Sequence, residues 1–378
     1  MTIRLLVLGG SFAGLDAAID LARRFGDRAR VTVIDQSDRF VFRPALPWLM
    51  LGQRTPEQIS APFRPLFRSH GVEFVQDRVE AIDPKANTVR TARGEWPYDF
   101  LVVALGATSP PAVPPDFALH GYSPLWIESA MKLRHALEQF RGGDVVVALH
   151  PRAPLICTGY EIVFLIHEFL TRRRLRQRST ITVITYEERP FAAAGPVGTA
   201  CVQRWLEREG IRCITSNFVD RVTDDCVELG DGRTLPTSLF IYIPAYQGPR
   251  LVKEIHNFTD ADGFITTDRR MQSLPYSNIY AAGDIVSFPG PKTGHMAELQ
   301  ARTAARNIAA ACGLTSPCEY QSYLACVSDF GFGRGVMAIR KPSPQQGAVR
   351  DVFALAGYLP NFVKLAFEKY FLYYRLRY

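Results

Sequence analysis

The sequence predicts an α/β fold with two Rossmann-like dinucleotide-binding domains, the first discontinuous, and a C-terminal helical region that associates with a membrane. Three observations lead to this prediction. A glycine-rich turn joins an apolar strand to an amphipathic helix within 3–22, a second strand–helix–strand pattern spans 144–185, and an aromatic tail covers 352–378. With 378 residues and 47% hydrophobic composition, the chain can form more than one packed core.

The first domain opens with an apolar strand at 3–8, a turn at 9–14 and helical spacing of apolar residues to 22. The middle glycine of the GxGxxG pattern is replaced by Ser11, and the next strand closes on Asp35, about 20 residues beyond the turn. A tight turn alone is the competing interpretation, but the strand, the helix and the acid together favour dinucleotide binding. The phosphates are expected on the amides at the start of the helix.

The second unit reads as a strand at 144–149, a helix at 160–170 and a strand at 180–185. Its turn contains Pro151 and Pro154 and only one glycine, Gly159, so it cannot lay successive amides against a pyrophosphate. The fold is therefore expected without its NAD site. A proline cluster at 110–115 and a return near 249 predict a first dinucleotide-binding domain at 1–110 and 249–312, a second domain at 111–248 and a C-terminal region at 313–378.

The formal charge of +7 is dispersed except for the basic run 172–178, which is typical of a solvated helix end, so we expect no nucleic-acid partner. Seven cysteines without CxxC pairs argue against a disulfide-stapled secreted scaffold. No apolar stretch of about 20 residues exists, which predicts no spanning helix. The start of the chain leaves no room for a signal peptide, so the cytoplasmic side of a membrane is expected.

The tail mixes aromatic residues with Lys364, Lys369, Arg375 and Arg377. Short amphipathic helices of this kind suit a lipid surface, with the cations at the head groups and the apolar face among acyl chains. The alternative is a helix that packs against its own core or a partner subunit. We favour contact with the bilayer surface.

Three of these segments, the turn at 9–14 with Asp35, the strand end at 104–106 and the stretch 278–285, resemble the pyridine nucleotide:disulfide oxidoreductase superfamily of flavoproteins. The resemblance covers residues 1 to about 312. The closer match looks like the sulfide:quinone oxidoreductase family, through the segments 42–48, 157–161, 291–294, 326–331 and 366–372. It implies FAD as cofactor, sulfide and a membrane quinone as substrates, a peripheral (monotopic) membrane location and a homo-oligomer.

The resemblance also implies which residues contact FAD. They lie in the glycine turn, after Asp35, at the ends of the central strands and before the closing helix. The implied contacts are Gly9, Ser11, Phe12, Ala13, Gly14, Asp35, Arg43, Pro44, Ala104, Gly106, Gly283, Asp284, Lys292, Thr293 and Gly294.

Two cysteines are the implied redox centre, because a thiolate held over a flavin can pass two electrons to it. Cys326 is the candidate for the flavin-facing sulfur, and Cys157 would close the bridge that HS⁻ opens. Cys157 stands at the start of a helix, so we expect the helix dipole to lower its thiol pKa. The alternative is that both are small buried hydrophobic residues.

Proton transfer to the quinone is assigned, again by resemblance, to Glu161 and Lys292, although Glu161 could also be an ordinary surface acid of its helix. An apolar slot between aromatic rings is expected for the quinone. Its candidate walls are Phe330, Phe332 and Phe362.

Three other functions remain open from the sequence. A type II NADH:quinone oxidoreductase would share the fold and the tail, but it needs a glycine-rich turn at 150–160. The flavoprotein subunit of a flavocytochrome c sulfide dehydrogenase is exported and covalently flavinylated, yet this chain has no cysteine before Cys157. A non-catalytic FAD-binding membrane protein is the third.

Overall fold

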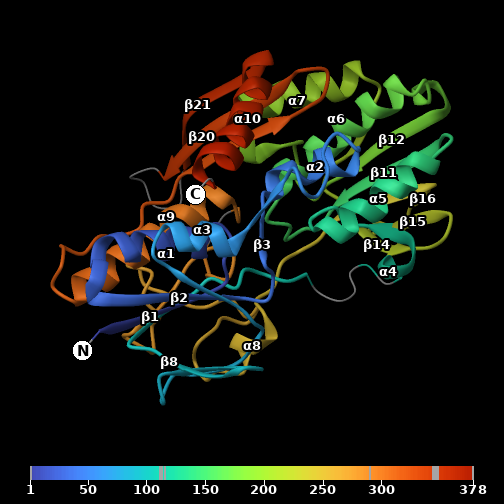
Figure 1. Cartoon of the computed structure of the whole chain (residues 1–378). Helices are drawn as coiled ribbons and strands as arrows, with labels where there is room; N and C mark the ends of the chain where they lie inside the picture. Colours follow the sequence, from blue (N-terminus) through green and yellow to red (C-terminus); the bar gives the residue numbers. More distant parts are fainter. Residues whose placement is uncertain (1, 110–113, 115, 289–290, 343–348, 377–378) are drawn as a thin grey trace.

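The structure is a computed structural model that describes residues 2–109, 114, 116–288, 291–342 and 349–376. The expected proline linker at 110–115 lies, apart from residue 114, outside the described residues. Two five-stranded sheets form two lobes, and the C-terminal strands and helix lie against both of them (Figure 1). The α/β class and the two Rossmann-like lobes predicted from the sequence are therefore confirmed.

The first lobe contains a parallel sheet in the order β18-β9-β1-β2-β5. Its inner strands are apolar on both faces, which is the pattern of a parallel sheet covered on each side. The strand at one edge comes from a distant part of the chain and pairs with β9. The strands are β1 (Ile3–Leu8), β2 (Ala29–Asp35), β5 (Glu73–Gln76), β9 (Phe100–Val103) and β18 (Ile279–Ala281).

Two long helices, α1 (Phe12–Phe25) and α9 (Gly294–Ala311), pack against each other on one face of this sheet. Residues 72–104 form strands that divide between two sheets. The first and last of these strands join the parallel sheet, and only β6–β8 form an antiparallel meander. The remaining elements are β3 (Arg39–Val41), α2 (Leu46–Met50), β4 (Ser60–Pro62), α3 (Phe63–Ser69), β6 (Val79–Asp83), β7 (Thr88–Thr91), β8 (Gly94–Pro97) and α8 (Arg250–Lys253).

The second lobe repeats the arrangement, with a parallel sheet in the order β10-β17-β11-β12-β13. Helix α6 is buried along most of its length because it lies between this sheet and the C-terminal strands. The strands are β10 (Gly121–Tyr122), β11 (Gly143–Leu149), β12 (Ser179–Ile184), β13 (Arg212–Ile214), β14 (Val219–Val222), β15 (Cys226–Leu229), β16 (Thr234–Pro236) and β17 (Leu239–Ile243). The helices are α4 (Phe117–His120), α5 (Ile127–Gln139), α6 (Ile156–Arg172) and α7 (Gly195–Arg208).

The C-terminal region differs from the helical tail that we expected. It begins with a three-stranded antiparallel sheet of β19 (Leu324–Asp329), β20 (Gly335–Pro342) and β21 (Val349–Gly357). Helix α10 (Tyr358–Tyr370) and a π-helical turn (Phe371–Arg375) follow. The apolar residues of 353–357 are therefore in a strand, because long-range pairing of β21 with β20 gives this alternating segment a sheet partner.

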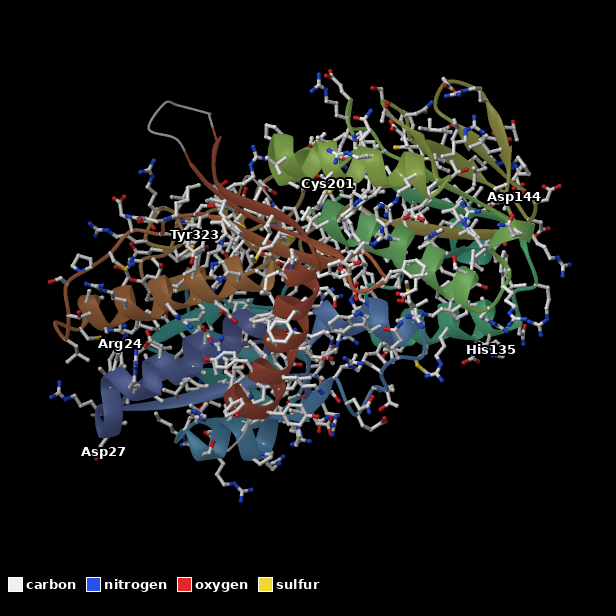
Figure 2. All side chains as sticks on the ribbon, turned by 90° about the horizontal axis from the view of Figure 1, so that it is seen from above. Arg24, Asp27, His135, Asp144, Cys201 and Tyr323 are labelled. Atoms are coloured by element: carbon white, nitrogen blue, oxygen red, sulfur yellow. The ribbon has the colours of Figure 1, made fainter. Side chains whose placement is uncertain are left out.

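Helix α10 lies across the junction between the first lobe and the second (Figure 2). Its charged residues Lys364 and Glu368 point inward and are almost fully buried, whereas Tyr358 and Phe362 are exposed. The expectation that Lys364 and Arg375 reach toward lipid head groups is wrong, because both are paired with buried carboxylates instead. Arg377 lies outside the described residues.

Among the described residues, no helix combines the length and the apolar character needed to cross a bilayer.

Candidate active site

The turn between β1 and α1 brings the strand, the helix and the end of β9 into close contact. Gly9 has a φ of 94°, and a Cβ there would lie 2.4 Å from the carbonyl oxygen of Ala104. A Cβ on Gly14 would lie 1.7 Å from the carbonyl oxygen of Gly9. Only glycine fits at these two positions, so the turn can be as tight as a nucleotide-binding turn requires.

Amide groups at this turn are directed toward one edge of the sheet. Gly10 donates its backbone N–H to Asp35 over 2.6 Å, and burial raises the pKa of the Asp35 carboxyl. The amides of Phe12, Ala13 and Gly14 open helix α1 with no acceptor from the described part of the chain. Such a helix start favours an anion, and phosphate is the common one.

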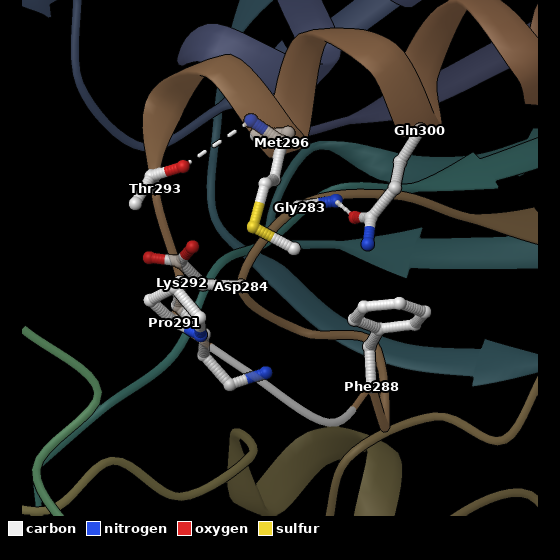
Figure 3. Close-up of a pocket in the computed structure, with 9 residues that line it drawn as sticks. Gly283, Asp284, Phe288, Pro291, Lys292, Thr293, Met296 and Gln300 are labelled. Carbon is white, nitrogen blue, oxygen red and sulfur yellow. Dashed lines mark hydrogen bonds between the residues drawn. The ribbon is translucent and has the colours of Figure 1, made fainter. Parts of the chain in front are cut away.

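A small cavity lies where β18 leads to helix α9 (Figure 3). Thr293 begins the helix by accepting a hydrogen bond from the Met296 amide over 3.3 Å, and Gln300 accepts one from the Gly283 amide over 2.8 Å. Gly294 packs against Phe12, so the cavity adjoins the first turn. It is lined by Gly283, Asp284, Phe288, Pro291, Lys292, Thr293, Met296, Ala297 and Gln300.

Charges of both signs face this cavity. Burial raises the pKa of the Asp284 carboxyl, while the cations of Lys292 and Arg43 oppose that shift. Burial also lowers the pKa of Lys292 to about 8, and its ammonium donates to the carbonyl oxygen of Val286 over 2.8 Å. Asp284 has no hydrogen-bond donor among the described residues, so its carboxylate is available to a ligand.

The other FAD residues expected from the sequence lie around the same sheet edge. Asp35 ends β2, Arg43 and Pro44 form a 3-10 turn, and Ala104 and Gly106 follow β9. The structure thus gathers the implied FAD contacts at the carboxyl ends of four neighbouring strands, which is where parallel sheets bind nucleotides.

Cys157 and Cys326 meet although they are far apart in the chain. Cys157 is in the first turn of helix α6, and Cys326 is in strand β19, which packs against that helix. The Cys157 thiol donates a hydrogen bond to the Cys326 sulfur. Both border a narrow hollow whose other walls are apolar. These walls are Phe191, Ala194, Val336 and Ala338.

The expected pKa of Cys157 is wrong in direction. The pKa of this thiol is raised, first because it donates to Cys326 and then because it is buried. The pKa of Cys326 is lowered by that same hydrogen bond, by Ser328 and by the charge of Lys364. Pairing and burial therefore outweigh the helix dipole, and Cys326 is the sulfur that ionises more easily.

One turn of helix α6 beyond Cys157, the buried Glu161 forms an ion pair with Lys364. The Glu161 carboxylate also accepts the Asp329 amide over 3.4 Å. Burial raises the pKa of Glu161 to about 7, and Lys364 opposes this. Glu161 is therefore not a surface acid, and its cation partner comes from the C-terminal helix, whereas Lys292 lies beside Asp284.

Trp48 joins this network to the first lobe. Its indole N–H donates to Asp329 over 2.9 Å, and the Lys364 ammonium lies 4.6 Å from the ring centroid. Arg54 lies over the same ring and pairs with Glu368. Sequence reasoning missed Trp48, Lys364 and Asp329 because nothing local marks them. The available signal was the spacing of Lys364 and Glu368, which puts opposite charges on one helix face.

The three rings expected around the quinone have three different environments. Phe330 is a core residue, stacked on Phe164 with 4.7 Å between ring centroids. Phe332 is at the β19–β20 turn with a φ of 50°, and Phe362 is exposed on α10. Phe330 thus offers no open face, in contrast to the expectation, because α6 and α7 already cover it.

Comparison with known proteins agrees with this geometry. Residues 3–301 match the family described as "Pyridine nucleotide-disulphide oxidoreductase". The chain is 30% identical to the sulfide-quinone reductase of Aquifex aeolicus, over 98% of this chain and 91% of that protein.

The chain belongs to the sulfide-quinone reductase group of this family.

The crystal structure of the sulfide:quinone oxidoreductase from Aquifex aeolicus superimposes with a TM-score of 0.93 at 27% identity, covering 100% of this chain and 92% of that one. A mitochondrial sulfide:quinone oxidoreductase from Mus musculus is 25% identical over 88% of this chain and 77% of its own length. The likeness to these sulfide-quinone reductases reaches beyond the nucleotide-binding part into the C-terminal region.

FAD is the cofactor of this family, and the residues present fit it. The unpaired amides at the start of α1 suit the pyrophosphate, and the partly buried carboxylate of Asp35 suits a ribose. Asp284, without a donor of its own, and Lys292 face the adjoining cavity. Because Gly9 and Gly14 have no side chains, the backbone of the turn between β1 and α1 is accessible to the cofactor.

Proposed function

We infer that this chain oxidises sulfide to polysulfide or sulfur at Cys157 and Cys326 and passes the electrons through FAD to a membrane quinone. The observation that carries the inference is that Cys157 of the second lobe and Cys326 of the C-terminal region border one apolar hollow. Bound FAD would supply the two-electron chemistry between the sulfur centre and the quinone.

The cysteines can process sulfide by exchange at sulfur. When they are bridged, HS⁻ attacks the Cys157 sulfur, the bridging S–S bond breaks, and Cys326 leaves as a thiolate while Cys157 carries a persulfide. The lowered pKa of Cys326 makes it the better leaving group. Closing a longer bridge through the new sulfur releases two electrons and one proton. The carboxylate of Glu161, whose pKa is about 7, can take that proton.

The walls of the hollow favour a neutral sulfur chain. Phe191, Ala194, Val336 and Ala338 present only carbon beside the two sulfurs. An anion released there would lose its hydration without gaining a partner, whereas zero-valent sulfur is apolar and polarisable. We therefore propose that sulfur is retained between the cysteines until the chain is long enough to leave.

The geometry disfavours the NADH:quinone alternative. In the second turn, the amides of His150, Arg152 and Ala153 donate to Ile243, to the His150 ring and to the His150 carbonyl. Prolines occupy 151 and 154 and have no N–H. These amides are already used by the protein, so a second pyrophosphate would find few free donors.

We also propose that helix α10 contacts the membrane surface and that the quinone enters the protein from that side. The outer face of α10 exposes large aromatic side chains, while two of its charged residues, Lys364 and Glu368, point inward. This arrangement supports peripheral attachment of the C-terminal region 313–378 to the bilayer. The exposed residues are Tyr358, Leu359, Phe362, Tyr370 and Tyr374.

Each of the three proposed domains supplies a different part of the site. An FAD unit at 1–110 and 249–312 is supported by the pairing of β18 with β9. The unit at 111–248 supplies Cys157, and the region 313–378 supplies Cys326 and Lys364.

Anaerobic mixing of the FAD-loaded protein with each electron donor tests the proposed function. Sulfide should bleach the flavin absorbance rapidly and stoichiometrically, and an added quinone should restore it. NADH at the same concentration should leave the spectrum unchanged. Rapid bleaching by NADH with none by sulfide would overturn the proposal in favour of an NADH:quinone oxidoreductase.

A further inference from the structure

The second lobe carries a buried acid, Glu187, close to the position where a nucleotide-binding domain holds the ribose. Register identifies the equivalent positions. Leu8 pairs with Ile34 in the first sheet, as Ala148 pairs with Ile184 in the second. The residue after Ile34 is the acid Asp35, whereas the residue after Ile184 is Thr185. The ribose-binding acid is therefore replaced by a hydroxyl, and the acid has moved two residues along the chain.

Glu187 points into the protein and is fully used there. It is 7% exposed, and its Oε2 accepts the Tyr160 hydroxyl over 2.9 Å and the Thr185 hydroxyl over 3.0 Å. Its Oε1 accepts the Ala192 amide over 2.8 Å. A buried carboxylate is retained only when its oxygens are satisfied in this way. Glu187 therefore ties helix α6 to the loop at 187–194.

That loop forms one wall of the hollow beside Cys157 and Cys326. Phe191 and Ala194 line it together with Val336 and Ala338. Phe191 has a φ of 61°, which a large side chain rarely adopts, so the surrounding contacts must hold it. Its ring lies 5.2 Å from the ring of Tyr160, the residue three positions after Cys157.

We propose that Glu187 is a positioning residue that holds the 187–194 loop against Cys157 and Cys326, so that the pair works on sulfur in an apolar hollow with limited access from solvent. The proposal rests on the proposed function of these cysteines. Glu187 lies near the position where a nucleotide-binding domain binds the ribose of its cofactor. In this protein it positions the loop beside the two cysteines instead. Glu187 does not touch sulfur. It acts through its hydrogen bonds with the Ala192 amide and the Tyr160 hydroxyl, and its charge also raises the pKa of the Cys157 thiol.

Two variants and one control separate this role from general stabilisation. Glu187→Gln keeps the size but turns one acceptor oxygen into an NH₂ group, so either the Ala192 amide or the two hydroxyls lose their partner. Tyr160→Phe removes one hydroxyl and leaves the loop bond intact. Glu188→Gln changes the exposed neighbouring acid and serves as the matched control.

The readout is alkylation of each thiol by an uncharged maleimide, under argon after reduction, followed by peptide mass spectrometry of the FAD-loaded protein. Rates are measured across pH and compared for the fully formed thiolates, because loss of the Glu187 charge by itself lowers the pKa of Cys157. On that basis Cys157 and Cys326 should react about tenfold faster or more in Glu187→Gln, since a buried hydrogen bond to a charged group is lost. Tyr160→Phe should give a smaller rise at the same two thiols. Glu188→Gln should match the unsubstituted protein, and Cys312 in the first lobe should react equally in all four.

Alkylation does not depend on sulfide turnover, so failure of the proposed function and failure of this inference are distinguishable. Unchanged rates at Cys157 and Cys326 in both variants would overturn the inference. A parallel rise at Cys312 would also overturn it, because Glu187 would then support the whole fold and not the wall. If the local rise appears but sulfide never bleaches the flavin, Glu187 positions the loop and the substrate assignment is what fails.

Discussion

The two lobes contain the same parallel sheet and differ at the turn that follows the first strand. In the first lobe, three residues separate β1 from α1, and Gly9 and Gly14 allow backbone atoms to approach each other closely. In the second lobe, the turn is longer, holds Pro151 and Pro154, and leads to Cys157. We propose that the first edge binds phosphate and the second holds sulfur, so that a single fold supplies the cofactor site and the reactive site.

The acids of the two lobes show the same difference. Asp35 accepts the Gly10 amide at the edge of the sheet, where a ribose can reach it. Glu187 is turned inward onto Tyr160, and Thr185 occupies the position equivalent to Asp35. The comparison teaches that a nucleotide site can be lost by redirecting its groups while the strands and helices around it stay in place.

Removing one sulfur should have the largest effect. Cys326→Ser should lower sulfide-dependent quinone reduction by about a thousandfold or more, because a serine hydroxyl neither ionises nor exchanges with sulfur. Steady-state assays with a soluble quinone measure it. Cys201→Ser, on helix α7, is the control and should retain activity. Full activity of Cys326→Ser would favour a non-catalytic role for this cysteine pair.

The second largest effect is expected from adding a methyl group at Gly14 or at Gly159, because only the first should lower FAD binding. Gly14→Ala drives a Cβ into the Gly9 carbonyl, so FAD retention should fall at least about tenfold. Gly159→Ala meets the Leu149 side chain at 2.9 Å, which can shift, and should retain FAD at a stability loss of about 1–3 kcal/mol. The FAD-to-protein absorbance ratio of purified protein measures the difference. Equal loss of FAD in both would contradict the assignment of the cofactor to the first turn.

Lys364 should tune the sulfur site through charge. Its ammonium lowers the pKa of both Cys326 and Glu161, so Lys364→Met should raise both. The thiolate then forms at higher pH, and the acid limb of the rate of flavin reduction by sulfide should move up by about one pH unit. Stopped-flow measurements across pH test this, with the exposed Lys369→Met as control. An unmoved profile would show that Lys364 does not influence the thiolate.

The smallest effect is expected at the exposed ion pair between Arg152 and Asp262, whose atoms are 2.9 Å apart. It joins the second turn to the chain returning to the first lobe. Arg152→Ala should change the free energy of unfolding by less than about 1 kcal/mol, because exposed pairs are screened. NADH should still fail to reduce the flavin, since the turn amides stay bonded. Denaturant titration and the anaerobic NADH test provide the two measurements.

Both lobes could be predicted from local sequence patterns. The strand, glycine turn and helix at 3–25 are specified by neighbouring residues, and so is the loss of the second turn through its prolines. The tail was misjudged because 353–357 alternates in a way that suits a strand only when β20 is beside it. Lys364 was placed at the surface because its buried partner, Glu161, lies far away in sequence.

The sequence by itself determined that two nucleotide folds exist and that only the first keeps a phosphate-binding turn, because glycine and proline act on the backbone where they stand. Only the tertiary structure decided which sulfur ionises more easily, which cation faces Glu161 and where Glu187 points. Those properties depend on burial and on charges from distant segments, and a pKa responds to what surrounds a group in space. The meeting of Cys157 and Cys326 belongs to this second kind, because helix α6 and strand β19 come together only when the C-terminal sheet packs on the second lobe.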